Sequence, residues 1–595
     1  AAKTEKWNEA NYITYLLLQS RDQVSTVQEK IDSYSGSVLK KEMQLQGSSY
    51  SRFYLEPLKD VHLYSELDGF EPNGNILYIY ILAAVAILIL LVACVNYTNL
   101  STAQSTGRSV EVGVRKVMGA DRKQVFYQFI AESFFTVMLA FMLGIGLAFL
   151  LLPYFNGLSG KDLSIAAILQ PQLLLVMLVL AIIITFTAGA YPSIVLASGR
   201  ITGILRSGYR LTGSGSLRKS LIVFQFVISV FLIISTVIII QQLNYIRNKE
   251  LGYDKDHVVV MPVDFSILDK YDDLKTALAM HSSIKSVGGA YEDPTHVGWE
   301  DGLSKGAEWD EASRISINAM PVDEDFIKTL DLQIIAGTDF NETDVMQFDT
   351  SDGGKNLHYS YILNESAVKA FGWTPGEAIG KTVTKNTSGQ VKAVVKDFHF
   401  RSLKEAIRPL TLFLDKRLVG SLFVKINGDV PAAIAHLEKT WKERIKHRPF
   451  EYHFLDEDYN ALYKTEEKAA AVFSGFAAIA VILACLGLFA LTAYTMVQRT
   501  KEIGIRKILG ATLADLLVLI SKDFLKLVLV AFVIAVPVSW YAANTWLESF
   551  VYHIPIQWWV FVMAGLVILA IAFITISMQA IRTSISNPVK NLRTE

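Results

Sequence analysis

The sequence contains few arrangements of side chains that could carry out a reaction. Residues 213–220 resemble a phosphate-binding loop, but Arg218 stands where the glycine before the lysine is required. Ser366 lacks the Gly-x-Ser-x-Gly elbow of a hydrolase nucleophile. The ten histidines include no His-Glu-x-x-His pair, and we interpret His399 as structural. The sequence therefore predicts no catalytic, cofactor-binding or metal-binding residues.

One charged string occurs twice. The pattern Glu-x-Gly-x-Arg-Lys-x-x-Gly-Ala begins at Glu111 and again at Glu502, each time between two long apolar runs. The two copies are 391 residues apart, and so are Cys94 and Cys485 in the preceding apolar runs. Because the register is kept from inside one run through the next loop, the repeat indicates an internal duplication.

Each copy of the string has the signals of a helix, a turn and a second helix. In both copies a glutamate lies four residues before an arginine, a spacing that favours an intrahelical ion pair, and apolar residues at steps of three and four predict one apolar stripe. Gly119 and Gly510 suit a left-handed closing residue. Capping boxes are expected to follow at 121–124 and 512–515. We expect two sharp elbows that present basic residues to a partner; the simpler alternative is that these charges only hold the segment in the cytoplasm.

The elements around the elbows are apolar segments long enough to cross a bilayer. Hydrophobic residues make up 51% of the chain, and a span needs about 20 apolar residues. This criterion predicts a helical membrane protein with seven spans: 76–98, 129–153, 171–197, 219–241, 469–494, 524–545 and 557–580. The formal net charge of −1 argues against a nucleic-acid partner.

Charge in the loops predicts the orientation. Loops 99–128 and 198–219 are rich in Lys and Arg, and the latter has no acidic residue, so both are expected in the cytoplasm. The long segment 242–467 then lies outside. Its short apolar runs at 258–261, 393–395 and 422–426 predict strands, and 322–330, 364–371 and 431–446 predict helices, which indicates an α+β domain.

The expected domain organisation has seven parts. We interpret 1–75 as the end of a first outer domain, because a second unit that opens with a span before its outer domain implies the same for the first. The parent protein would then have eight spans. The parts are an outer-domain remnant (1–75), a three-span unit (76–198), a basic linker (199–218), a span (219–241), an outer α+β domain of two lobes (242–467), a second three-span unit (468–583) and a cytoplasmic tail (584–595).

Taken together, these strings resemble the permease subunits of MacB/FtsX-type ABC transporters, in the long form with two permease units in one chain and here truncated at the N-terminus. The two elbow strings carry the resemblance, with further motifs at 93–103, 241–253, 362–366, 371–373, 379–381, 395–399 and 484–489. The resemblance implies a bacterial inner-membrane protein with periplasmic α+β domains.

The resemblance also implies a mechanism and a partner. The elbows would dock a separate ABC ATPase subunit, in two copies, which would hold the ATP and Mg²⁺; lipids and a periplasmic adaptor or hydrolase are further expected partners. ATP-driven motion would then reach the periplasmic domains by mechanotransmission, for efflux, lipoprotein extraction or control of a cell-wall hydrolase. The coupling residues carried over are Glu111, Gly113, Arg115, Lys116, Gly119, Glu502, Gly504, Arg506, Lys507 and Gly510.

Two other classes of protein remain as alternatives. A membrane sensor or scaffold could bind a ligand outside and signal through the basic loops without an ATPase. A membrane peptidase is disfavoured, because the sequence shows no nucleophile, metal motif or paired intramembrane carboxylates. Asn96 and Asn99 lie near the inner end of the first span, either bonded between helices or at the membrane interface.

Overall fold

The computed structural model describes most of the chain and divides it into two units. The described residues are 14–42, 53–65, 76–198, 214–264, 266–347, 358–385, 387–498, 502, 505–506 and 508–585. The first unit comprises residues 1–91 and the second comprises 92–595.

Two helices precede the first apolar helix in the first unit. They are α1 (Gln23–Glu42) and α2 (Leu58–Tyr64), and α3 (Ile76–Gly107) begins here and continues into the second unit. The side chain of Gln28 on α1 donates to the carbonyl of Phe53 (2.8 Å) and accepts from the backbone N–H of Leu55 (2.7 Å). This pair of bonds fixes the extended segment before α2 against α1.

The described helices confirm a helical membrane protein. Five apolar stretches are long enough to cross a bilayer: Ile79–Thr102, Arg122–Leu158, Lys219–Asn248, Lys464–Met496 and Trp558–Ile581. The other two predicted spans fall in α7, whose apolar part Pro171–Thr187 is shorter, and in α19. The count of seven spans therefore stays a prediction.

The helices after α3 are α4 (Ser109–Val117), α5 (Arg122–Ser159), α6 (Ile165–Ile168), α7 (Pro171–Ser198), α9 (Ser214–Asn248), α17 (Lys464–Gln498), α19 (Leu513–Leu547) and α20 (Trp558–Ile585).

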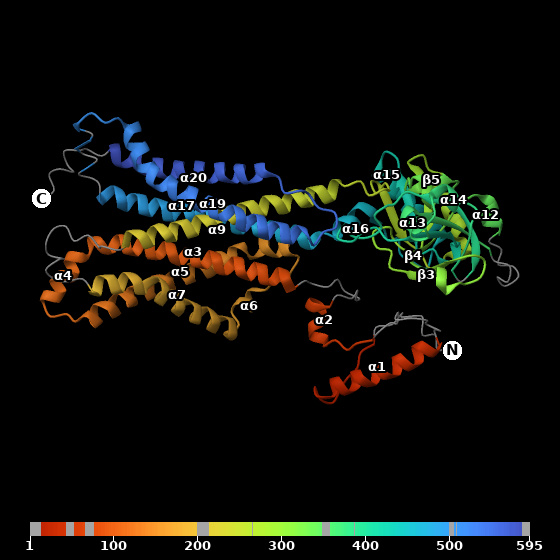
Figure 1. Cartoon of the computed structure of the whole chain (residues 1–595), viewed down its shortest axis with the longest axis horizontal. Coiled ribbons are helices and arrows are strands. Elements are labelled where there is room, and N and C mark those ends of the chain that lie inside the picture. The colour runs from red at the N-terminus through yellow and green to blue at the C-terminus, as the bar shows by residue number, and fades with distance from the viewer. Residues whose placement is uncertain are drawn as a thin grey trace. The chain divides into compact units, whose positions relative to one another are not determined.

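Helix α9 is the most enclosed of the apolar helices. It packs along α17 and α19, and α20 packs on α17 and α19 (Figure 1). In its most apolar stretch 56% of the residues are buried, against 6% in the stretch within α5. Ile222, Phe226 and Val230 follow one face of α9 into a shared apolar core. Helix α9 is therefore the centre of the helices from the second copy.

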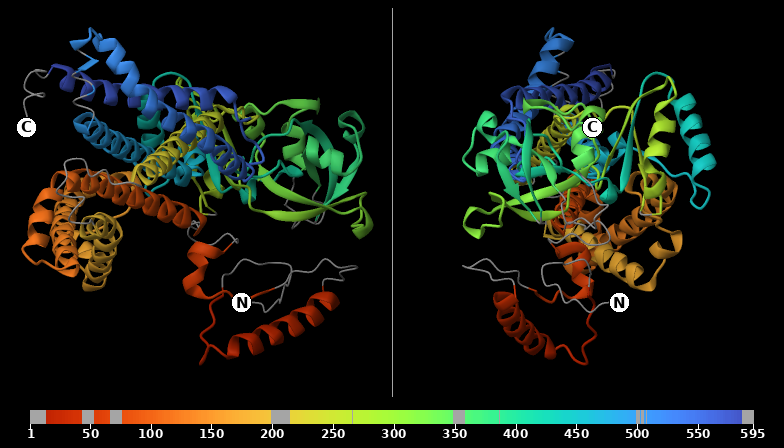
Figure 2. Two further views of the ribbon diagram at one scale, coloured as in Figure 1. Left: turned by 60° about the vertical axis from the view of Figure 1, so that its left-hand side comes forward. Right: turned by 90° about the vertical axis from the view of Figure 1, so that its right-hand side faces the viewer.

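The α+β domain between α9 and α17 is built on one continuous sheet (Figure 2). Its order is β11-β1-β10-β2-β4-β3-β7-β8-β6-β9, with β5 on β8. Strand β4 also pairs in parallel with β9, which closes β4-β3-β7-β8-β6-β9 into a ring. The strands are β1 (Val258–Pro262), β2 (Ile284–Ala290), β3 (Glu300–Lys305), β4 (Ile315–Val322), β5 (Ile334–Gly337), β6 (Tyr359–Asn364), β7 (Thr382–Thr384), β8 (Ser388–Val395), β9 (Leu410–Leu414), β10 (Ser421–Ile426) and β11 (His453–Phe454).

Two apolar cores lie on this sheet. One joins β1, β2 and β10 to α10 (Tyr271–Ala279) and α15 (Val430–Arg444) around Trp441. The other fills the closed ring and continues under α13 (Glu365–Ala370) and α14 (Pro375–Ala378). The three predicted strands are confirmed, as are the predicted helices at 364–371 and 431–446. The predicted helix 322–330 is helical only over α11 (Phe326–Thr329), because the acidic residues before it turn towards a buried lysine. The remaining helices are α12 (Glu342–Gln347) and α16 (Leu455–Ala461).

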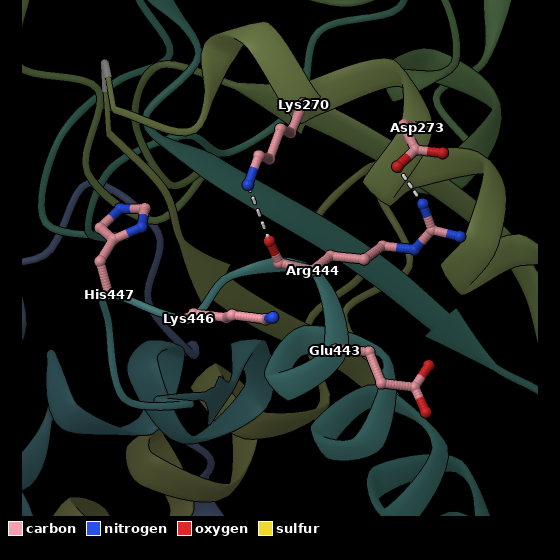
Figure 3. A pocket seen from close by; sticks show the side chains of 6 residues that line it. All are labelled: Lys270, Asp273, Glu443, Arg444, Lys446 and His447. Carbon is pink, nitrogen blue, oxygen red and sulfur yellow. Dashed lines mark hydrogen bonds and ion pairs between the residues drawn. The ribbon is translucent and has the colours of Figure 1, made fainter.

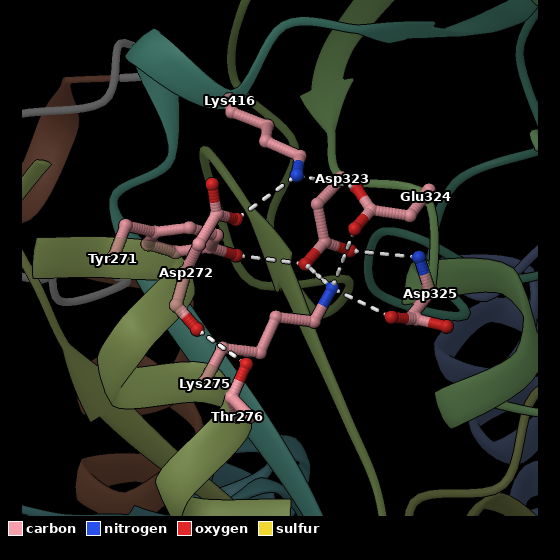
Figure 4. A network of polar contacts seen from close by, with 8 residues as sticks. All are labelled: Tyr271, Asp272, Lys275, Thr276, Asp323, Glu324, Asp325 and Lys416. Atoms are coloured by element: carbon pink, nitrogen blue, oxygen red, sulfur yellow. Dashed lines mark hydrogen bonds and ion pairs between the residues drawn. The ribbon is translucent and has the colours of Figure 1, made fainter. Parts of the chain in front are cut away.

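That lysine organises a buried ionic network between α10 and the segment that follows β4 (Figure 4). The ammonium of Lys275 lies 2.7 Å from carboxylate oxygens of both Asp323 and Asp325. Tyr271 donates its hydroxyl to the same Asp323 oxygen at 2.7 Å. Asp323 is fully buried, so its charge depends on these partners.

Candidate functional site

The first elbow has the geometry that the sequence predicts. Helix α4 ends in a Schellman turn, in which the N–H of Ala120 donates to the carbonyl of Arg115 at 3.0 Å and Gly119 adopts φ = 97°. Asp121 and Gln124 then form a capping box at the start of α5. The helix–turn–helix and its cap are confirmed (Figure 1).

The second elbow repeats this geometry where the structure describes it. The N–H of Ala511 donates to the carbonyl of Arg506 at 3.0 Å, and Gly510 has φ = 94°. Thr512 and Asp515 form the capping box that opens α19. The expected coupling residues Gly504 and Lys507 lie outside the described residues.

Both predicted intrahelical ion pairs are present. The distance between the guanidinium and carboxylate is 2.8 Å in Arg115–Glu111 and 2.8 Å in Arg506–Glu502. Such exposed pairs contribute only about 0.3–0.5 kcal/mol, so they do not by themselves hold the elbows in shape.

In the first elbow a clamp that the sequence analysis missed ties α4 to α5. Arg115 also donates to the side-chain oxygen of Gln128 at 2.7 Å, and Arg108 pairs with Glu132 at 2.7 Å. Position 519, which is 391 residues after Gln128, is Leu519. Arg115, which we expected to pair with Glu111 and to be presented to a partner, is thus also bonded to α5 within its own elbow. These partners are 13 and 24 residues apart, beyond any helical spacing that the sequence could show.

The apolar stripe of α4 faces outward. Val112 is buried and packs with Val125 and Phe129 of α5. The stripe is exposed in both copies, at positions that match in register. The exposed fractions are Val114 49%, Val117 61% and Met118 83% in the first copy, and Ile505 53%, Ile508 66% and Leu509 80% in the second. Equivalent residues are again 391 apart. Because exposed apolar patches mark interaction sites, this duplicated patch, next to the basic residues, is the candidate docking surface.

A second set of contacts joins the long helices to the α+β domain at the neck, which we define as residues 242–253, 396–404 and 453–467. Tyr459 of α16 donates its hydroxyl to the carbonyl of Ile246 on α9 at 3.0 Å. The hydroxyl of Tyr463 accepts from the backbone N–H of Leu403 in the domain at 2.7 Å. These contacts bind the end of α9 and the residue before α17 to the base of the domain, and the ion pair Arg247–Glu467 joins α9 to α17.

The loop between α19 and α20 is tied into the neck as well. The side chain of Gln242 on α9 donates to the carbonyl of Tyr552 (3.1 Å) and accepts from the N–H of Ile554 (2.9 Å). His399 of the domain packs edge-on against the ring of Tyr552. Helix α9 is therefore in contact with this loop through Gln242, and the loop is in contact with the domain through Tyr552.

The α+β domain also carries a polar hollow between α10 and the end of α15 (Figure 3). Its lining is mostly charged: Lys270, Asp273, Glu443, Arg444, Lys446 and His447. Lys270 donates to the carbonyl of Arg444 at 3.1 Å, and Arg444 pairs with Asp273. These pairs hold the wall together and do not form a nucleophile–base arrangement.

Two regions of the chain match one known protein family. Residues 83–201 and 474–588 each match the FtsX-like permease C-terminal family. These two regions contain the two elbows, so a domain similar to this family occurs twice in the chain.

Curated relatives agree with this assignment. The chain is 29% identical over 182 residues to the macrolide export ATP-binding/permease protein MacB of Aggregatibacter actinomycetemcomitans, covering 28% of each chain. It is 31% identical over 85 residues to the MacB protein of Psychrobacter cryohalolentis, covering 14% of this chain and 13% of that protein. The chain thus spans less than a third of the length of these relatives.

Two solved structures are similar to part of the chain. They are the periplasmic region of MacB from Actinobacillus actinomycetemcomitans (19% identity, TM-score 0.25, covering 36% of this chain and 94% of that one) and the extracellular domain of the ABC-type transporter YknZ from Gram-positive bacteria (12% identity, TM-score 0.22, covering 33% and 96%).

Proposed function

We propose that this chain is the permease subunit of an ABC transporter, driven by a separate ATPase that docks on the two elbows. The single observation that carries the proposal is the matching exposed patch: three apolar side chains at the same register positions of both copies. Exposed apolar patches mark interaction sites, so the repetition of this patch in both copies supports a binding partner at each elbow. The coupling residues remain the ten carried over in the sequence analysis.

Contacts within each elbow connect the docking segment to the long helix that follows it, and they would carry motion of the ATPase to that helix. In the first, the Arg115–Gln128 and Arg108–Glu132 contacts cross-link α4 to α5, so a force on α4 moves α5 with it. In the second, the Schellman turn and capping box join the docking segment to α19 without a flexible linker. Helix α19 packs on α9, which continues to the neck.

Motion of the helices would then reach the α+β domain through the neck. The bonds Tyr459–Ile246 and Leu403–Tyr463 connect both long helices to the domain. These contacts support mechanotransmission, in which the domain moves while cargo is handled outside the membrane. The excess of Lys and Arg in the loops supports a cytoplasmic location for the elbows and a periplasmic one for the domain, as expected in a bacterial inner membrane.

Two units in one chain supply both halves of a pseudo-two-fold assembly, so one polypeptide would dock two ATPase copies. Efflux, lipoprotein extraction and control of a cell-wall hydrolase remain the cargo classes that this mechanism fits. The ATP and Mg²⁺ would be held by the ATPase.

The test is co-purification of the full chain with an ABC ATPase from its own cell. Val117→Asp together with Ile508→Asp is expected to abolish capture of the ATPase, because each places a charge in the middle of one patch. Met280→Asp is the matched control, since Met280 is 79% exposed on the α+β domain and should leave capture unchanged. Arg115→Glu with Arg506→Glu should also abolish it.

Two results would overturn the proposal. One is normal ATPase capture by the Val117→Asp/Ile508→Asp variant. The other is ligand-dependent signalling by a wild-type chain that captures no ATPase, which would favour the sensor or scaffold.

A further inference from the structure

Three side chains from separate segments converge beside the neck. His453 lies on the edge strand β11, Asp458 on α16, and Asp293 in the loop after β2. The imidazole Nε2 of His453 is 3.0 Å from Oδ2 of Asp458 and 3.7 Å from Oδ2 of Asp293. One nitrogen or oxygen atom from each residue lies within 4.8 Å of the other two.

Two carboxylate oxygens of this cluster are buried but lack hydrogen-bond donors in the described part of the chain. Oδ1 of Asp293 and Oδ2 of Asp458 are buried without a hydrogen-bond partner among the described residues. The approach of Asp458 to the ring is therefore close but not directed along an N–H bond, as a hydrogen bond requires. A buried polar atom left unpaired costs about 1–3 kcal/mol, so two of them at one point call for an explanation.

Tyr253 adds a third unpaired oxygen. It lies between α9 and β1, its side chain is 92% buried, and its hydroxyl has no partner among the described residues. Burial raises the pKa of Tyr253, and the charges of Tyr463, Asp293 and Asp458 raise it further. The preceding residue, Gly252, packs closely on the domain, because a Cβ there would lie 2.8 Å from Cβ of Phe398.

We propose that Asp293, His453 and Asp458 form a site for a divalent transition metal, with Zn²⁺ as the best match. Zinc binds imidazole nitrogen and carboxylate oxygen at about 2.0–2.2 Å in a tetrahedron, whose ligand–ligand edges are then about 3.4 Å. The two separations from His453, 3.0 and 3.7 Å, lie on either side of that length. Two carboxylates and a neutral imidazole balance the charge of the ion, and the fourth position is left for water.

The competing interpretation is an ion triad without metal. The two carboxylates raise the pKa of His453 to about 10, so in the absence of metal an imidazolium would sit between them. A triad explains the charge of the ring and pairs the ring with Oδ2 of Asp458. It leaves Oδ1 of Asp293 without a partner among the residues that the structure describes, whereas a water molecule on a bound metal ion supplies a donor for that atom.

The position of the site gives it a role. Asp458 lies six residues before α17 begins at Lys464, and Tyr253 lies five residues after α9 ends at Asn248. A metal ion here would cross-link the sheet, the loop after β2 and the base of both long helices, and it would stiffen the joint through which helix motion reaches the domain. The site does not depend on the ATPase.

The test uses the full chain in detergent, freed of metal with a chelator and titrated with ZnCl₂ alone by calorimetry and thermal unfolding. We expect one Zn²⁺ per chain and a higher Tm. Asp293→Asn, His453→Gln and Asp458→Asn should each weaken binding at least tenfold and lose the Tm increase. Glu457→Gln is the matched control, because Glu457 is an exposed carboxylate on the same helix.

Asp293→Asn keeps the test valid if the other variants misfold, since it changes a loop residue and leaves β11 and α16 intact. Absence of zinc binding by the wild-type chain, or equal affinity in wild type and a folded Asp293→Asn chain, would overturn the proposal and leave the ion triad. Failure of ATPase capture would leave it untouched.

Discussion

The side chain of Gln225 on α9 donates a hydrogen bond of 2.7 Å to the backbone carbonyl of Leu483 on α17. The same carbonyl accepts a second bond, of 2.6 Å, from Asn96 of α3. Three helices therefore meet at one carbonyl within their apolar segments. Of the two alternatives for Asn96, bonding between helices is confirmed. Gly487 makes this approach possible, because a Cβ there would lie 2.2 Å from Oδ1 of Asn96.

Replacing Gly487 with alanine should therefore destabilise the helices. The added methyl group would displace both amides from the Leu483 carbonyl, and interhelical hydrogen bonds in membranes contribute about 0.6–1.7 kcal/mol each. Thermal unfolding of the full chain in detergent should show a lower Tm. Gly475→Ala on the same helix is the control: its Cβ would meet nothing within 4 Å, so its Tm should be unchanged or higher. Equal Tm values for the two variants would show that the junction contributes nothing.

Replacing the glycine in each elbow turn with alanine should also be unfavourable, but because of the backbone conformation and not because of a steric clash. Gly119 and Gly510 have open space around them but positive φ values of 97° and 94°. Alanine at such a position costs about 1–2 kcal/mol in backbone strain. The double variant Gly119→Ala/Gly510→Ala should therefore lower the yield of captured ATPase, whereas Gly144→Ala, in the interior of α5 and equally open, should not. Full capture by the double variant would contradict the role of the turn.

Removing one hydroxyl should loosen the neck. Tyr463→Phe leaves the fully buried N–H of Leu403 without its acceptor, and an orphaned buried donor costs about 1–3 kcal/mol. Hydrogen exchange should show faster exchange of the Leu403 amide and its neighbours. Tyr452→Phe, where the ring is 41% exposed, should leave exchange as in the wild type; an unchanged Leu403 amide in Tyr463→Phe would refute the contact.

The buried network in the domain should be intolerant of a missing cation. Lys275→Met removes the partner of the fully buried Asp323, and breaking a buried pair in this way costs about 3–5 kcal/mol. Denaturant unfolding of the full chain, followed by tryptophan fluorescence, should show a much lower midpoint for the domain. Lys328→Met, an exposed lysine on α11, is the control and should change it little. A shift as small as that of the control would mean that Asp323 is neutral in the folded state.

His399 should make the domain sensitive to mild acid. Burial, together with the charge of Lys249, lowers the pKa of His399 from 6.5 to about 4. Between these values the unfolded chain binds a proton that the folded chain does not, so this contribution to stability is complete above pH 6.5 and is lost as the pH falls towards 4. His399→Phe, which keeps a ring against Tyr552, should lose less stability than the wild type between pH 7 and pH 5. Parallel pH profiles would exclude this origin.

Local features were predictable from the sequence, and contacts between distant segments were not. The capping boxes at Asp121 and Thr512 and the turns at Gly119 and Gly510 depend on neighbouring residues, whose chemistry is visible in the order of the chain. The outward stripe of Val114, Val117 and Met118 was recognised as apolar, but its direction was not, since α4 is too short for its pattern to show which side packs.

Nothing in the sequence indicated that residues distant in the chain come together in the fold. Asp293 and His453 are 160 residues apart in the sequence, and only the pairing of β11 with β1 brings His453 to the base of the domain. The absence of a metal motif predicted an absence of metal sites, but a sequence motif can report only ligands that are close in the chain.

The duplication within one polypeptide has a practical consequence. In a homodimer every substitution appears on both sides, so one arm can never be impaired alone. Here Val117 and Ile508 occupy equivalent positions but are encoded separately in one gene. The first elbow has Gln128 where the second has Leu519. A substitution can therefore inactivate one elbow alone, and the activity of that variant would show whether the ATPase needs both docking sites or only one.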